Sequence, residues 1–199
     1  MNTGYLDSYV AFLKKFLTVR RPLRVVFDCS NGMTGPVLRK LFKTNKLITY
    51  KLINLVPDGR FPAHGPNPLA AGAMDALSRA VRRARADFGA IFDADGDRVF
   101  FADEGGRFIP PDAAAAFMSR SFRGPVILDC ASGYRIREFL AQARRKIIES
   151  RVGHRFIKEL MRKTRVAFAA ETSGHYYFSD FFFCDSGILA AIKVMNAAS

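Results

Sequence analysis

Three aspartates alternate along one short stretch of the sequence: Asp93, Asp95 and Asp97, with Gly96 inside the run and Arg98 directly after it. Carboxylates this close repel one another unless positive charge lies among them. Hard oxygen ligands beside a flexible glycine suit Mg²⁺. The spacing therefore predicts a loop that binds a divalent cation.

Two other structures share parts of this pattern. An acidic turn between strands is the ordinary interpretation of two alternating aspartates, but the third aspartate and Arg98 favour a metal loop. A calcium loop of the EF-hand type also begins with three alternating acids, and Glu104 falls at its twelfth position. That loop requires glycine at its sixth position, where this chain has Arg98, and helices on both sides, where this chain has strand-like sequence. The calcium interpretation is therefore excluded.

A second polar cluster follows another strand-like run, at residues 170–176. It combines the carboxylate of Glu171, the hydroxyl of Ser173 and the imidazole of His175. Such groups can hold sugar hydroxyls by hydrogen bonds. On spacing alone, a polar turn explains the cluster equally well.

An alternation of strands and helices positions both clusters. Hydrophobic periodicity and turn residues predict strands at 23–29, 47–56, 88–92, 99–102, 107–109, 125–130 and 166–170, and helices at 5–19, 35–42, 69–86, 112–122, 135–146 and 156–163. This order predicts an α/β fold with two consecutive domains, residues 1–122 and 123–199, and mainly parallel sheets. The aspartates then lie at the carboxyl end of a parallel strand, where open α/β sheets bind ligands.

Composition narrows the class of protein. With 199 residues and 49% hydrophobic content, the chain can bury one or two cores. It has no apolar run of the roughly 20 residues that a membrane span needs, and it lacks a signal-peptide pattern, so we expect a cytoplasmic protein without a membrane partner. Cys29, Cys130 and Cys184 are an odd number at wide spacing, which argues against a disulfide framework and a paired-cysteine zinc site. We expect them to be buried thiols.

The net charge of +13 leaves nucleic acid open as a partner. Basic residues gather on predicted helices at 79–85 and 144–146, and such runs are most often solvated faces. No aromatic-rich RNA-binding signature, zinc finger or basic zipper accompanies them. We therefore expect only non-specific binding to nucleic acid.

The stretch Asp-Ala-Asp-Gly-Asp-Arg at 93–98 resembles the metal loop of the α-D-phosphohexomutases, the phosphomannomutase and phosphoglucomutase group. The usual form is D-G-D-G-D-R or D-G-D-A-D-R, and only Ala94 departs from it. The resemblance implies that the three aspartates hold Mg²⁺ together with a phosphoserine from another domain. It also implies a catalytic position beside the phosphate for Arg98.

Two further segments carry the resemblance. Residues 170–176 are similar to the sugar-recognition loop, usually G-E-x-S-G-H, with Ala170 as the departure, which implies that Glu171, Ser173 and His175 bind substrate. Residues 151–158 are similar to a segment of the form K-[VT]-G-H-x-[FL]-I-K, which makes His154 a second catalytic candidate.

The resemblance covers residues 5–195 and implies the second and third domains of a phosphohexomutase, each with an α/β/α fold. The family reaction is Mg²⁺-dependent phosphoryl transfer between the 1- and 6-positions of a hexose phosphate. The phosphoserine loop of the first domain and the phosphate-binding loop of the fourth do not occur here, and Ala131 stands where the family usually has a lysine. We therefore expect the isolated chain to be inactive unless a separate chain supplies those domains. The alternative is a non-catalytic module that binds sugar phosphate or nucleic acid.

Overall fold

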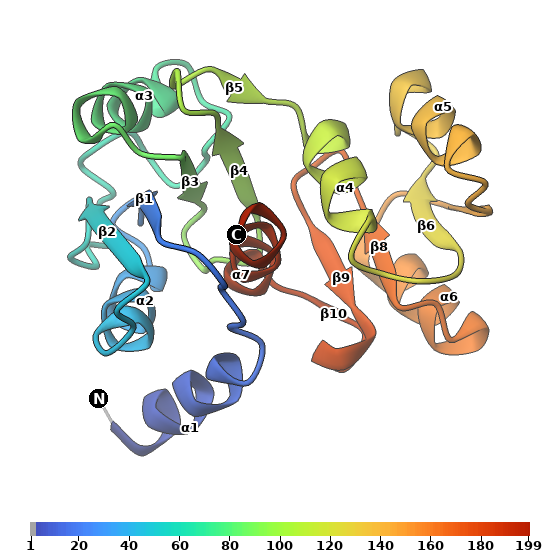
Figure 1. Ribbon diagram of the computed structural model, residues 1–199, viewed down its shortest axis with the longest axis horizontal. Helices are drawn as coiled ribbons and strands as arrows, with labels where there is room; N and C mark the ends of the chain where they lie inside the picture. Colours follow the sequence, from blue (N-terminus) through green and yellow to red (C-terminus); the bar gives the residue numbers. More distant parts are fainter. Residues whose placement is uncertain (1–2) are drawn as a thin grey trace.

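The computed structural model describes residues 3–199, which form two five-stranded sheets (Figure 1). The first sheet has the order β2-β1-β3-β4-β5. Its strands are β1 (Leu23–Asp28), β2 (Ile48–Ile53), β3 (Phe88–Phe92), β4 (Val99–Ala102) and β5 (Phe108–Ile109). The pairs β1–β2 and β1–β3 are parallel, whereas β3–β4 and β4–β5 are antiparallel.

Helices cover both faces of this sheet. Alternate residues of β1 point to opposite sides, so Phe27 packs in the same core as α2 (Thr34–Phe42), and Val26 packs with α3 (Ala73–Ala84). The helix α1 (Thr3–Lys14) lies against α2. Because both faces are covered, all residues of β3 are buried.

The second sheet has the order β10-β9-β8-β6-β7. Its strands are β6 (Val126–Asp129), β7 (Ile147–Ser150), β8 (Phe168–Ala170), β9 (Tyr176–Phe178) and β10 (Cys184–Asp185), with the 3₁₀ turn η1 (Ser179–Phe181) before β10. The pairs β6–β7 and β6–β8 are parallel, and β8–β9 and β9–β10 are antiparallel. The helix α6 (His154–Thr164) packs on one face through Ile157 and Met161.

The two halves share one hydrophobic core. The helix α7 (Gly187–Ala198) lies between the sheets and contacts both β4 and α4 (Pro111–Ser119) (Figure 1). Its N-cap, Ser186, accepts a hydrogen bond from the Leu189 amide. The helix α5 (Tyr134–Gln142) packs on α4 at the far side. The helix α4 contacts both β4 of the first sheet and β8 of the second. The domain boundary expected after residue 122 therefore stays a prediction.

The predicted α/β fold with two consecutive sheet units is confirmed. Each sheet is mixed, with two parallel and two antiparallel strand pairs, where mainly parallel sheets were expected. The strand at 88–92 and the strand at 99–102 lie at their predicted residues. The helix predicted at 135–146 is too long, because α5 ends at Gln142 and the chain then enters β7, which the sequence did not reveal. This short edge strand is only partly buried, so its residues lack a clear two-residue periodicity.

Two predictions about single residues are wrong. Cys29 is buried, but Cys130 is exposed and Cys184 is partly exposed, so the thiols are not all buried. Arg145 lies after α5 and is not part of a solvated helix face. Its guanidinium donates hydrogen bonds to the carbonyl oxygens of Ser119, Phe122 and Gly124, at the end of α4 and in the turn that follows it.

Among the residues that the structure describes, no helix is both long enough and apolar enough to cross a lipid bilayer.

Candidate functional site

The aspartate loop follows β3 at its carboxyl end, as predicted. Asp93 is buried and organises the loop: its Oδ1 accepts hydrogen bonds from the amides of Gly96 at 3.1 Å and Arg98 at 3.2 Å. Its Oδ2 accepts a hydrogen bond from Nε of Arg98 at 2.7 Å. Gly96 has a φ of +82°, a conformation that glycine adopts without strain. The loop is therefore held in shape by one of its own carboxylates.

One oxygen from each of Asp93, Asp95 and Asp97 lies within 4.8 Å of the other two. Burial raises the pKa of Asp93, and the nearby charge of Asp97 raises it further, against the lowering effect of Arg98. A divalent cation among the three carboxylates would offset both the burial and the repulsion. An all-oxygen set of this kind fits Mg²⁺.

Two glycines allow neighbouring helices to approach the loop closely. A Cβ at Gly32, just before α2, would lie 2.3 Å from the carbonyl oxygen of Ala94. The amide of Gly187, the first residue of α7, donates to the carbonyl oxygen of Gly96 at 3.0 Å, and a Cβ there would lie 2.7 Å from the carbonyl oxygen of Arg98. The loop is thus fixed by backbone contacts from both halves of the molecule.

The second polar cluster follows β8, and the Glu171 side chain holds it in place through two hydrogen bonds. The Glu171 carboxylate is buried, and its Oε1 accepts a hydrogen bond from the Gly153 amide at 2.8 Å. Its Oε2 accepts one from the hydroxyl of Tyr177 at 2.5 Å. Burial, followed by the contact with Glu171, raises the pKa of Tyr177, so this hydroxyl stays a donor. Glu171 therefore joins the start of α6 to the loop that carries His175.

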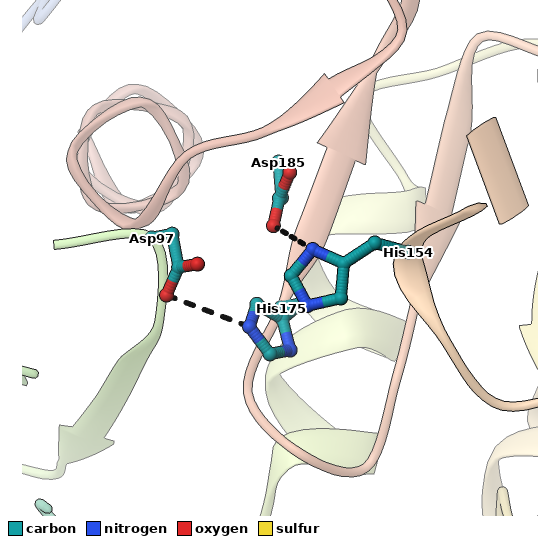
Figure 2. Close-up of side chains that lie close together, drawn as sticks. All are labelled: Asp97, His154, His175 and Asp185. Carbon is teal, nitrogen blue, oxygen red and sulfur yellow. Dashed lines mark ion pairs between the residues drawn. The ribbon is translucent and has the colours of Figure 1, made fainter. Parts of the chain in front are cut away.

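His175 brings the two loops together (Figure 2). Its Nε2 lies 3.5 Å from Oδ1 of Asp97, and its Nδ1 lies 2.8 Å from Oγ of Ser173. The contact with His175 is the main reason that the pKa of Asp97 falls to about 2. A backbone bridge between Arg98 and His175 runs beside this side-chain contact. Residues that are almost 80 positions apart in the sequence thus form one site.

His154 begins α6 and completes the cluster. Its Nδ1 lies 3.0 Å from Oδ2 of Asp185, and its ring meets that of His175 edge to face, with centroids 4.2 Å apart (Figure 2). Lys158 contacts the other oxygen of Asp185, with Nζ 2.8 Å from Oδ1. Sequence reasoning missed Asp185 and Lys158. The spacing of four residues between His154 and Lys158 was a usable signal, because it places both on one helix face.

A cavity of about 520 Å³ opens over the aspartate loop. It is lined by Pro66, Asn67, Asp93, Ala94, Asp95, Asp97, Arg98 and His175. Of the predicted site residues, the three aspartates, Arg98 and His175 therefore share one cavity. Ser173 and Glu171 lie near Nδ1 of His175. The His154 ring packs against the His175 ring and lies next to Asp185.

Models of known protein families match almost the whole chain. Residues 4–106 match domain II, an α/β/α domain, of the phosphoglucomutase/phosphomannomutase family, and residues 112–199 match domain III. The phosphomannomutase of Escherichia coli strain K12 is 36% identical in an alignment of 199 positions. The alignment covers 94% of this chain and 44% of that protein. The phosphomannomutase of Vibrio cholerae is 33% identical, with 98% of this chain and 44% of that protein covered.

Solved structures give the same result for the fold. A phosphoglucomutase/phosphomannomutase family protein from Burkholderia thailandensis superposes with a TM-score of 0.88 at 26% identity, covering 98% of this chain and 44% of that one. An N-acetylphosphoglucosamine mutase from Aspergillus fumigatus, solved with GlcNAc-6P and magnesium, superposes with a TM-score of 0.69 at 16% identity, covering 97% of this chain and 50% of that one. The chain spans less than half the length of the curated relatives that it matches. With both of its sheet units matched in order, this chain belongs to the phosphoglucomutase/phosphomannomutase family.

Proposed function

We propose that the chain forms the metal- and sugar-binding centre of a phosphohexomutase. The reaction is intramolecular phosphoryl transfer between the 1- and 6-positions of a hexose phosphate. The observation that carries this proposal is the convergence of Asp93, Asp95 and Asp97 with His175 on one cavity. A cytoplasmic location, expected from the sequence, belongs to the same proposal.

The residues of the centre have separable roles. Asp93, Asp95 and Asp97 would hold Mg²⁺, which would supply positive charge to polarise phosphoryl oxygens. Arg98 orients Asp93 through its Nε and presents its partly exposed side chain to the cavity, beside the position proposed for the phosphate. His175 and His154 offer imidazole nitrogens to the sugar. Glu171 and Ser173 hold the His175 loop in place.

Ser173 is not proposed as a nucleophile, although it lies beside an imidazole. Its Oγ contacts Nδ1 of His175, and the nearest oxygen of Glu171 lies 3.5 Å from that same nitrogen. In a serine–histidine–acid triad, the serine and the acid contact opposite ring nitrogens. This arrangement therefore orients His175 rather than activating Ser173.

The chain by itself should not complete the reaction, because no residue of the centre is positioned to carry the phosphoryl group between sugar positions. Ala131, which is exposed just after β6, also provides no group for proton transfer where the family usually has lysine. We propose that a separate chain bearing the phosphoserine and phosphate-binding domains completes the enzyme. A non-catalytic module that binds hexose phosphate is the second candidate, and Ala131 is the residue that favours it.

A coupled assay with glucose 1-phosphate or mannose 1-phosphate, Mg²⁺ and a hexose bisphosphate activator tests the proposal. We expect no turnover from this chain alone, and turnover when a chain carrying the first and fourth domains of a relative is added. Turnover by the complemented pair should disappear with Asp95→Asn. Turnover by the isolated chain that survives Ser173→Ala would show that another residue carries the phosphoryl group.

A further inference from the structure

A basic cavity of about 270 Å³ lies between α3 and β2, the edge strand of the first sheet (Figure 1). Its charged lining consists of Lys51, Arg79 and Arg83, and none of the described acidic residues lines it. It shares no lining residue with the cavity over the aspartate loop. The function proposed above gives these three cations no role.

The fold brings the three side chains together. Alternate residues of a strand point to the same face, and Ile53 of β2 packs in the core under α3, so Lys51 lies on that face as well. Arg79 and Arg83 are four residues apart on α3, which places them on one side of the helix. Two alanine side chains of α3 also line the cavity, and their small size leaves it open.

The three cations have no partner within the described part of the chain, because none of them forms an ion pair or donates a side-chain hydrogen bond there. Even Asp75, one helical turn before Arg79, forms no ion pair with it. Arg82 differs from its neighbour Arg83, because its guanidinium donates to the carbonyl oxygen of Gly105 at 3.4 Å. The charge of the basic cavity is therefore available to a ligand.

A solvated basic face is the competing interpretation. Positive charge in the last turn of a helix is favourable, which accounts for Arg83. A lysine on an edge strand discourages pairing with another chain, which accounts for Lys51. Neither reason applies to Arg79, which lies in the middle of α3, one turn before another arginine. Like charges at this spacing destabilise a helix, so an anion that bound both would relieve the repulsion.

The chemistry of the lining suits phosphate oxygens. Arginine offers paired N–H donors that match phosphate in geometry, and lysine adds a point charge. A single phosphoryl group carries about −1.5 to −2 charges at neutral pH, which three cations exceed. Two linked phosphoryl groups match the charge more closely. A cavity of about 270 Å³ is small for a whole organic ligand, so it holds the charged end of one.

We infer that Lys51, Arg79 and Arg83 form a binding site for the diphosphate group of a small molecule, separate from the proposed Mg²⁺ loop. The phosphate backbone of nucleic acid has related chemistry, but a duplex spreads one negative charge over each step of about 1.7 Å along its axis. Three cations around one cavity concentrate positive charge at a single point, which favours the compact anion.

Titration calorimetry with inorganic diphosphate tests this site in a metal-free buffer of low ionic strength. We expect saturable binding to the purified chain. Lys51→Gln, Arg79→Gln and Arg83→Gln should each lower the affinity about threefold or more, as for exposed charge pairs. All three side chains are exposed, so the variants should fold. Asp95→Asn should leave binding unchanged, because Asp95 belongs to the aspartate loop.

Arg162→Gln is the charge-matched control. Arg162 is an exposed arginine in the last turn of α6, as Arg83 is in α3, and its substitution should leave the affinity unchanged. An equal loss in this variant would overturn the site, because it would show attraction by the overall charge of the chain. Absence of saturable binding to the wild type would also overturn it. So would a short DNA duplex that binds and responds to the three substitutions while diphosphate does not.

Discussion

At the scale of single residues, burial decides which side chains can react. The Cys29 thiol is fully buried, and this burial raises its pKa to about 12, whereas Cys130 is exposed on the surface. Because the thiolate is the reactive form, we expect iodoacetamide to alkylate Cys130 in the native chain at neutral pH and to leave Cys29 unmodified. Peptide mass spectrometry measures both sites in one sample. Equal modification of the two cysteines before denaturation would contradict the buried position of Cys29.

A buried ion pair predicts a pH dependence of stability. Nε2 of His64 lies 3.3 Å from Oδ2 of Asp28, and this carboxylate raises the pKa of His64 in spite of burial. A group whose pKa is raised by folding stabilises the native state below its unfolded pKa, about 6.5 for histidine, and this contribution is lost as the pH rises through the folded value. His64→Gln should therefore lower the free energy of unfolding more at about pH 5.5 than at about pH 8.5.

Chemical denaturation of both proteins at the two pH values measures this difference. An equal loss at both values would show that the proton on His64 does not contribute to stability. Asp28 also accepts two hydrogen bonds from Nδ2 of Asn54, so its own substitution would disturb more than one contact. The histidine variant is therefore the cleaner test.

At the scale of elements, the backbone contact between α7 and the aspartate loop holds the loop in position. Gly187→Ala places a methyl group 2.7 Å from the carbonyl oxygen of Arg98 and 2.8 Å from that of Gly96, so the loop or the helix must move. We expect a loss of about 1–3 kcal/mol in the free energy of unfolding, together with weaker Mg²⁺ binding. Gly59→Ala is the matched control, since a Cβ there meets no atom within 4 Å. If the two variants bind Mg²⁺ equally well, α7 does not position the loop.

The sequence predicted the elements whose signals are local. The buried run at β3 and the aspartates after it combine an uninterrupted apolar stretch with a recognisable loop, and both lie where they were predicted. Asp185 was missed as a site residue, because its neighbours Lys158 and His154 come from a helix about 30 residues earlier. Contacts of this kind depend on how the second sheet folds back on itself, and periodicity cannot reveal that. The short strand β7 was missed for the same reason, since its strand character comes from pairing with β6.

At the scale of the whole molecule, the charge of +13 is the property that membership of the mutase family explains least. Some of the basic side chains stabilise the fold. Arg145, for example, donates hydrogen bonds to three carbonyl oxygens. The remaining basic surface should bind nucleic acid without sequence preference, with an affinity that falls steeply as salt rises. Gel-shift assays with several unrelated duplexes at rising ionic strength test this. A single sequence that stayed bound near physiological salt would indicate a dedicated nucleic-acid function.

The proposed role of the aspartate loop is to bind Mg²⁺. Titration calorimetry with Mg²⁺ or Mn²⁺ should give weak binding to the wild type, and Asp95→Asn should reduce the affinity by at least about tenfold, because one of three carboxylates is lost. Asp95 is exposed, so the fold should tolerate this change. Glu104→Gln removes another exposed carboxylate outside the loop and should leave binding unchanged. Equal heats for the wild type and Asp95→Asn would contradict the assignment of the metal site.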